Sequence, residues 1–227
     1  MAHRLIVLLA LVLTAAVELV AAAQGPATAS TGGKPPDALA RELQTRYQSI
    51  RDFSADFVQS YRAGVLKTQG SQERGMVAIK KPGKMRWTYT KPERKELVSD
   101  GVKLYWYEAE IKQVIERDVA TLTSTPDLFL SGRGDIARDF TASYIDTPVQ
   151  GTVALKLVPR KNEPEYEYLV VALDPGTLQI RGLMSKDHQG GESTFTFGNI
   201  RENRGLSDKD FVFRVPSGVK VVTDTGR

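Results

Sequence analysis

Residues 76–107, MVAIKKPGKMRWTYTKPERKELVSDGVKLYWY, carry the pattern from which the fold of this chain can be predicted. Pro-Gly, Lys-Pro and Asp-Gly pairs divide the stretch into short segments, as turns do between strands. Large apolar side chains alternate with polar ones from Met85 to Tyr89, and again at Leu104 and Trp106. A period of two places successive side chains on opposite faces of a strand. The stretch therefore predicts consecutive β-strands that share one apolar face.

Similar segments predict further strands outward from this stretch, closely spaced and joined by short turns. Such spacing favours an antiparallel meander. Neither an internal repeat nor a break in composition divides the chain, so we expect a single domain over residues 37–227. The further strands are predicted at residues 52–62, 69–81, 95–99, 102–107, 111–117, 140–146, 152–159, 166–173, 179–186 and 193–199.

Helical patterns are few. An apolar stripe predicts a helix over residues 37–50, with Asp37 as its N-cap. Residues 125–132 predict a second, short helix, because Pro stands at its first position, bulky apolar residues fill one turn and Gly follows. Another short turn is expected at residues 135–138. The stripe of the first helix consists of Leu39, Leu43, Tyr47 and Ile50.

The first 23 residues have the pattern of a secretory signal peptide. His3 and Arg4 precede an apolar run over residues 5–17, and small alanines stand at the expected cleavage positions. Residues 24–36 are rich in Ala, Gly, Ser, Thr and Pro, which indicates a flexible tether. The net charge of +4 comes from interspersed charges, and the chain has no Cys. We therefore expect an exported chain without disulfides, thiolate metal ligands or a lipid anchor on Cys.

Candidate catalytic residues are sparse. Only His188 would remain after signal cleavage, in a Gly-rich turn, and no Gly-x-Ser-x-Gly elbow is present. The acidic pairs Glu108/Glu110 and Glu163/Glu165 could serve a glycosidase, but solvated surface pairs are the more ordinary interpretation. The sequence also contains no phosphate-binding Gly-rich loop. We expect no enzyme activity, cofactor or metal, while a hydrolase that uses His188 stays open as an alternative.

A basic cluster lies beside the aromatic strand residues: Lys80, Lys81, Lys84 and Arg86. Basic and aromatic side chains together can bind single-stranded nucleic acid. Alternation places Arg86 on the face opposite Trp87, however, so charge and aromatic rings do not share a surface. We therefore expect no nucleic-acid partner.

The apolar residues point instead to a hydrophobic face. Only two main helical segments are available to cover it, so a curved sheet would leave a lined cavity, although a filled barrel would give the same pattern. A cavity with Met and aromatic walls suits a lipid. The apolar residues assigned to this face are Phe53, Phe57, Met76 or Val77, Met85, Trp87, Leu104, Trp106, Tyr144, Leu155, Leu157, Tyr168, Val170, Ile180 and Met184.

Residues 81–107 also carry a family resemblance. Lys-Pro, Met-Arg-Trp-x-Tyr, Pro, Leu-Val-Ser-Asp-Gly and Leu-x-Trp-x-Tyr occur in that order. This ordered set resembles the periplasmic outer-membrane lipoprotein carrier proteins, the LolA-like family, and a looser resemblance runs over residues 39–222. It implies a mainly β (α+β) fold: a strongly curved, incomplete antiparallel barrel whose open, apolar concave side is lidded by helices.

The resemblance also implies a function. Such a carrier would act in the periplasm, as a monomer, taking acylated lipoproteins from an inner-membrane ABC transporter complex. It would shield their acyl chains and deliver them to an outer-membrane lipoprotein receptor. That receptor is a lipid-anchored relative, and the missing Cys favours the free carrier here. The alternative is a carrier or sensor of another lipid or glycolipid on the same fold.

Site residues follow from the apolar face and the resemblance together. The family has a lid-latch Arg immediately before the Pro, where this chain has Lys81. Lys offers three donors on a compact, strongly hydrated head, whereas Arg offers five in a rigid fork. We therefore expect a weaker or altered lid contact, or a divergent cargo. The expected lipid-cavity residues are Leu43, Tyr47, Phe53, Phe57, Met85, Trp87, Leu104, Trp106, Leu128, Phe129 and Leu130.

Overall fold

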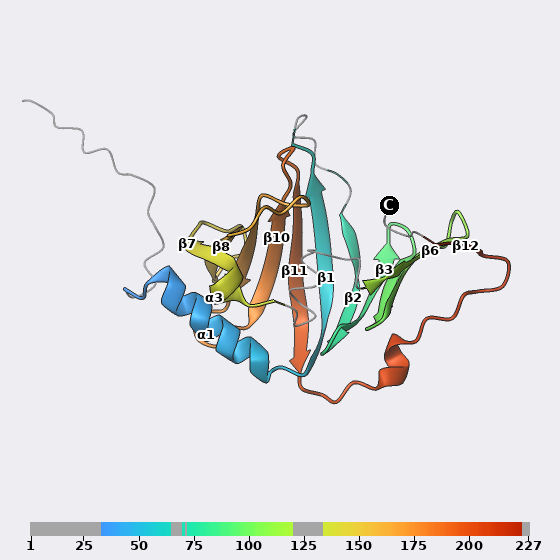
Figure 1. Cartoon of the computed structure of the whole chain (residues 1–227), viewed down its shortest axis with the longest axis horizontal. Coiled ribbons are helices and arrows are strands. Elements are labelled where there is room, and N and C mark those ends of the chain that lie inside the picture. The colour runs from blue at the N-terminus through green and yellow to red at the C-terminus, as the bar shows by residue number, and fades with distance from the viewer. Residues whose placement is uncertain (1–32, 65–69, 71, 120–133, 224–227) are drawn as a thin grey trace, which may run out of the picture.

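A computed structural model describes residues 33–64, 70, 72–119 and 134–223 (Figure 1). The described strands form one curved sheet of twelve, with β7 and β12 at its open edges and β1 paired with β11 near the middle. All neighbouring strands pair antiparallel except β12 with β6. The mainly β, curved, open antiparallel sheet expected from the sequence is confirmed. The sheet order is β12-β6-β5-β4-β3-β2-β1-β11-β10-β9-β8-β7.

Most strand boundaries fall within a few residues of the predicted ones. The last strand, β12, was not predicted, since it has four residues, mostly exposed, without an apolar alternation. It pairs in parallel with β6 through Val221 opposite Val114, after a long connection from β11. The strands are β1 (Asp52–Arg62), β2 (Glu73–Lys80), β3 (Lys84–Lys91), β4 (Lys95–Asp100), β5 (Lys103–Glu108), β6 (Gln113–Asp118), β7 (Phe140–Tyr144), β8 (Val153–Pro159), β9 (Tyr168–Leu173), β10 (Ile180–Lys186), β11 (Glu192–Glu202) and β12 (Lys220–Thr223).

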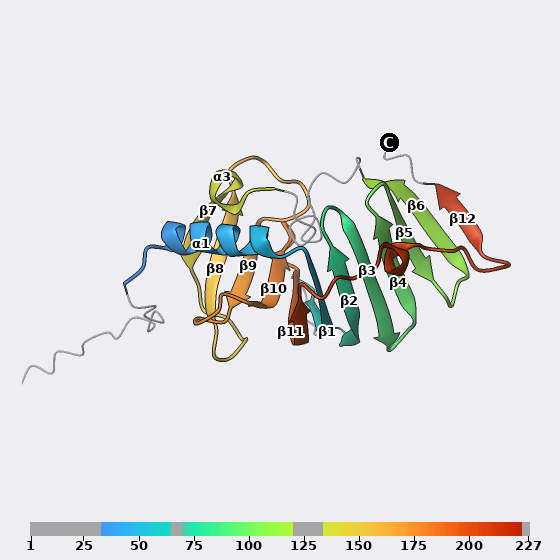
Figure 2. The same cartoon turned by 90° about the horizontal axis from the view of Figure 1, so that it is seen from below.

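Helix α1 (Pro36–Ser49) lies across the β7–β10 half of the sheet (Figures 1 and 2). Its apolar stripe is buried, as predicted. The predicted N-cap, Asp37, is wrong: the helix already begins at Pro36, because Pro fits a first-turn position where its missing N–H is not needed. Asp37 lies instead in the first turn, where its charge favours the helix dipole.

Helix α3 (Ile136–Asp139) confirms the short turn expected near residues 135–138. The carboxylate of Asp135 caps it by accepting a hydrogen bond from the Arg138 backbone N–H at 2.9 Å. The side-chain oxygen of Gln44 on α1 accepts a hydrogen bond from the Ile136 N–H, also at 2.9 Å, and joins the two helices. The predicted helix over residues 125–132, the signal peptide over 1–23 and most of the tether over 24–36 lie outside the described residues. None of the described helices is long and apolar enough to cross a membrane.

The main core lies on the concave face of the sheet, and α1 covers its β7–β10 half (Figure 2). An aromatic cluster stands at the centre of this core, where the Phe57 ring meets Trp87, Tyr89 and Phe195 with centroid distances of 5.1, 4.9 and 5.9 Å. Gly75 on β2 makes this packing possible, since a Cβ there would lie 2.0 Å from the Thr88 carbonyl oxygen and 2.9 Å from the Phe57 ring. The cluster is therefore close-packed against backbone that cannot accept a side chain.

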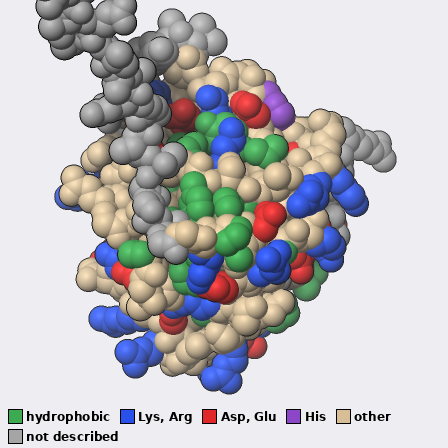
Figure 3. All heavy atoms as spheres, turned by 90° about the vertical axis from the view of Figure 1, so that its left-hand side faces the viewer, with side chains coloured by type: hydrophobic (Ala, Val, Ile, Leu, Met, Phe, Trp, Pro, Cys, Tyr) green, Lys and Arg blue, Asp and Glu red, His purple; other side chains and the backbone are tan. Residues whose placement is uncertain are grey.

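Three residues assigned to the concave face lie elsewhere. Tyr168, Val170 and Met184 pack with Ala154 in a second, smaller cluster. For Tyr168 and Val170 the reason is that β9 is buried along its whole length, so both of its faces carry apolar residues and alternation cannot identify the concave one. Met184 lies opposite Val170 on β10. Figure 3 views the molecule from the side of α1 and β7 and shows apolar side chains exposed in a group there, with charged side chains around them.

The opposite, convex face carries the C-terminal segment with its 3₁₀ turn η2 (Asp208–Phe211). The Arg86 guanidinium donates hydrogen bonds to the backbone carbonyls of Asp210 at 2.7 Å and Val212 at 2.9 Å. Lys80 and Lys84 both pair with the Asp208 carboxylate, whose pKa they lower to about 2. Three members of the basic cluster, Lys80, Lys84 and Arg86, thus hold the chain's own C-terminal segment on the face opposite Trp87, as the alternation predicts for Arg86, whereas Lys81 contacts α1.

Candidate functional site

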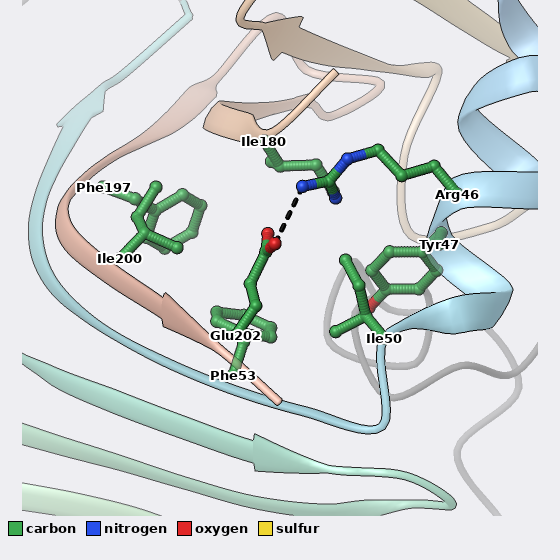
Figure 4. A pocket seen from close by; sticks show the side chains of 8 residues that line it. All are labelled: Arg46, Tyr47, Ile50, Phe53, Ile180, Phe197, Ile200 and Glu202. Atoms are coloured by element: carbon green, nitrogen blue, oxygen red, sulfur yellow. Dashed lines mark hydrogen bonds and ion pairs between the residues drawn. The ribbon is translucent and has the colours of Figure 1, made fainter. Parts of the chain in front are cut away.

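A small pocket opens between the C-terminal end of α1 and the sheet (Figure 4). Its volume is about 20 Å³, room for about one water molecule. The walls are apolar except for one arginine and one glutamate. The lining residues are Arg46, Tyr47, Ile50, Phe53, Ile180, Phe197, Ile200 and Glu202.

The two charged residues of this pocket tie α1 to the sheet. Arg46 Nη2 lies 2.7 Å from a carboxylate oxygen of Glu202 at the end of β11. Arg46 Nε donates a hydrogen bond of 2.5 Å to the Thr177 carbonyl in the β9–β10 turn. Both charged side chains are about one-fifth exposed, at 23% and 20%. The pair is therefore partly desolvated, and moving α1 away would break it.

Lys81, at the end of β2, makes the second polar attachment of α1. Its ammonium donates a hydrogen bond to the Tyr47 carbonyl oxygen in the last turn of the helix and lies 3.3 Å above the centroid of the Tyr47 ring. Carbonyls at a helix C-terminus attract cations, and so does an aromatic face. Burial nevertheless lowers the pKa of Lys81 to about 8 and raises the pKa of the Tyr47 hydroxyl. The Lys81 ammonium is therefore charged at a position where removing its water costs free energy.

The structure brings together all the expected cavity residues that it describes. Leu104 and Trp106 are half-buried against the same core cluster, while the others are its buried members. Leu128, Phe129 and Leu130 lie outside the described residues. The buried members are Leu43, Tyr47, Phe53, Phe57, Met85 and Trp87.

Sequence reasoning missed several residues of this region. Phe195 and Phe197 contribute aromatic rings from β11, and their alternation within residues 193–199 would have identified them. Arg46 and Glu202 give no such signal, because they are 156 positions apart and are ordinary charged residues in their own segments.

The candidate catalytic residues have structural contacts. A ring nitrogen of His188, Nε2, forms a hydrogen bond of 2.7 Å with the backbone carbonyl of Glu163. Burial and the neighbouring Glu163 raise the pKa of Glu165. Glu108 accepts a 2.5 Å hydrogen bond from the Trp106 indole nitrogen. Within the described ranges, no group of His, Asp and Glu side chains could hold a metal ion.

Comparison with known proteins identifies the family. The profile described as outer membrane lipoprotein carrier protein LolA matches residues 48–214. The chain belongs to the LolA family. An outer-membrane lipoprotein carrier protein of Methylococcus capsulatus is 33% identical over 80% of this chain and 86% of its own length. One of the same name from Chromohalobacter salexigens is 32% identical, over 88% and 91%.

A solved structure shares the LolA-family fold. It is an uncharacterized conserved protein of Thermus thermophilus, with a TM-score of 0.51 and 14% identity. The match covers 82% of this chain and 99% of that protein. At this identity the likeness concerns the fold alone.

Proposed function

We propose that this LolA-family chain is a periplasmic, non-enzymatic carrier of lipoproteins. It takes acylated lipoproteins released from an inner-membrane ABC transporter, binds their acyl chains against the concave face, and delivers them to an outer-membrane receptor. The observation that carries the proposal is a large apolar face partly covered by a short helix, whose polar attachments include those at Lys81 and Arg46. The names of the relatives support the lipoprotein as cargo.

The closed pocket requires a conformational change for binding. Its volume of about 20 Å³ cannot hold an acyl chain, so α1 and the side chains below it must separate from the sheet. The proposed acyl-binding residues are therefore those that line this interface and become exposed together on opening. Leu128, Phe129 and Leu130 remain proposed members of the lid.

The free energy of burying an acyl chain explains why α1 should be attached to the sheet by polar contacts. Burying one sixteen-carbon chain is worth about 12 kcal/mol at ~0.8 kcal/mol per CH₂. Unless another contribution to the free energy favours release, the lipid would stay bound. Contacts that re-form on closure, such as those of Lys81 and Arg46, offset part of that free energy and allow transfer to a tighter receptor without ATP at that step.

A release assay tests the proposal. Residues 24–227 are incubated with spheroplasts that display a newly acylated lipoprotein, and the supernatant is analysed for a one-to-one complex. Soluble complex is the expected result, and incubation without the chain is the control. If no lipoprotein is released but purified protein contains another lipid, the cargo is different. If neither is found, the carrier proposal is wrong.

Replacing Lys81 with Leu is expected to leave cargo loading intact and to slow transfer to the receptor about threefold or more. Leu removes the contacts to the Tyr47 carbonyl and ring, so less free energy of closure opposes the bound lipid. Transfer is measured as lipoprotein appearing in receptor-containing outer-membrane vesicles. Lys209→Leu, on the exposed η2 turn, is the matched control for loss of one charge. Equal transfer rates for the Lys81 variant and the native chain would remove Lys81 from the latch role.

A further inference from the structure

Trp87 carries a polar atom that the fold does not use. The side chain is 1% exposed, and its indole Nε1 has no hydrogen-bond partner among the described residues. Buried Trp N–H groups usually find a partner, and a buried donor without one destabilises the fold. The other tryptophan follows the rule, since Trp106 Nε1 donates to Glu108 at 2.5 Å. An unpaired donor at the centre of the concave face is therefore a feature to be explained.

The rings that contact Trp87 among the described residues belong to phenylalanines. The Trp87 ring lies 5.1 Å from the rings of both Phe57 and Phe195 and 6.3 Å from that of Phe197. Its cross-strand partners are Val77 on β2 and Leu97 on β4. None of these side chains has an oxygen that could accept a hydrogen bond.

A route to Trp87 begins at the pocket beside α1. Phe197 lines that pocket (Figure 4). Its ring centroid lies 6.3 Å from that of Trp87. A chain that enters between Ile50 and Ile180 and displaces the Phe197 ring would therefore reach the indole next. Arg46 and Glu202 mark the polar mouth of this route, and Trp87 provides an N–H donor beyond it.

The chemistry of the donor selects the acceptor. An indole N–H is a single neutral donor. None of the side chains in ring contact with Trp87 is charged, so a carboxylate or phosphate there would be desolvated without a counter-charge. We propose that Trp87 Nε1 donates a hydrogen bond to the carbonyl oxygen of an acyl ester when lipid occupies the concave face. This inference rests on the proposed carrier function and adds to it a polar contact that recognises the ester.

An ester and ether pair of ligands tests it. 1-Palmitoylglycerol and 1-hexadecylglycerol have sixteen-carbon chains and the same head group, and only the first has a carbonyl. The native chain is expected to bind the ester about three- to tenfold more tightly, the range for one neutral hydrogen bond. In Trp87→Phe, which keeps an aromatic ring but removes the donor, the preference is expected to disappear.

Indole N–H signals in ¹H–¹⁵N NMR spectra give an independent measurement on the native chain. The sequence has two tryptophans, and Trp106→Phe assigns their signals. The Trp87 signal is expected to move downfield when the ester binds. The ether is expected to cause no downfield shift. Trp106, already bonded to Glu108, is the internal control.

The outcomes separate the inference from the proposed function. Equal affinity for both ligands, without a downfield shift of the Trp87 signal, would overturn the ester contact and leave lipid binding in place. Failure of the native chain to bind either ligand would overturn both. An ester preference with the downfield shift supports the inference even if Trp87→Phe does not fold.

Discussion

Replacing Phe57 with Ala is expected to lower the free energy of unfolding by about 3–5 kcal/mol. Phe57 is 2% exposed and contacts Trp87, Tyr89 and Phe195 within the aromatic cluster. Its removal loses apolar burial and ring contacts, and the cavity left cannot collapse readily because the β2 and β3 backbones meet closely at Gly75. Urea unfolding followed by far-UV circular dichroism measures the loss.

Two further variants serve as comparisons for Phe57→Ala. Tyr61→Ala removes an aromatic side chain from the exposed end of the same strand, where 47% of the residue is exposed, and is expected to cost less than about 1 kcal/mol. Phe57→Leu keeps most of the apolar volume and should fall between the two. A loss below about 1.5 kcal/mol for Phe57→Ala would mean that the concave face is loosely packed and already accommodates a void.

Between about pH 7 and about pH 9.5, the free energy of unfolding of the native chain should rise by about 1–2 kcal/mol relative to that of Lys81→Met. Burial lowers the pKa of Lys81 from its ordinary 10.5 to about 8. Between these values the unfolded chain binds more protons than the folded one, so stability rises with pH. The magnitude is reduced because solvent still screens part of the side chain. Urea unfolding of both proteins across this range measures the difference.

Lys81→Arg provides the control for this titration. The guanidinium stays charged over the whole range, so the stability of this variant should parallel that of Lys81→Met as pH rises. Parallel curves for the native chain and Lys81→Met would show that the folded protein does not bury this charge.

Local patterns in the sequence were sufficient to predict most of the sheet. Strict alternation from Met85 to Tyr89 identified the face that is buried, and the stripe of α1 identified the face that covers it. Such patterns work because the side-chain period of a strand or helix is fixed by its backbone. The same periods placed Arg86 opposite Trp87, which the contacts of Arg86 with the C-terminal segment confirm.

Contacts between distant segments required the tertiary structure. Arg46 with Glu202 and Lys81 with Tyr47 join residues with no local pattern, because an ion pair or a cation over a ring depends on where two elements meet. The parallel pairing of β12 depends likewise on the path of the connection after β11.

Periodicity and ordered motifs, both readable in the amino-acid sequence, were thus enough to establish the fold class, the apolar face and the family. Which polar groups attach α1 to that face became known from the arrangement of the elements in space. That arrangement also leaves the Trp87 N–H without a hydrogen-bond partner among the residues that the structure describes. Whether a donor is satisfied depends on all of its neighbours in space, and for Trp87 these come from β1, β2, β4 and β11 as well as from its own strand.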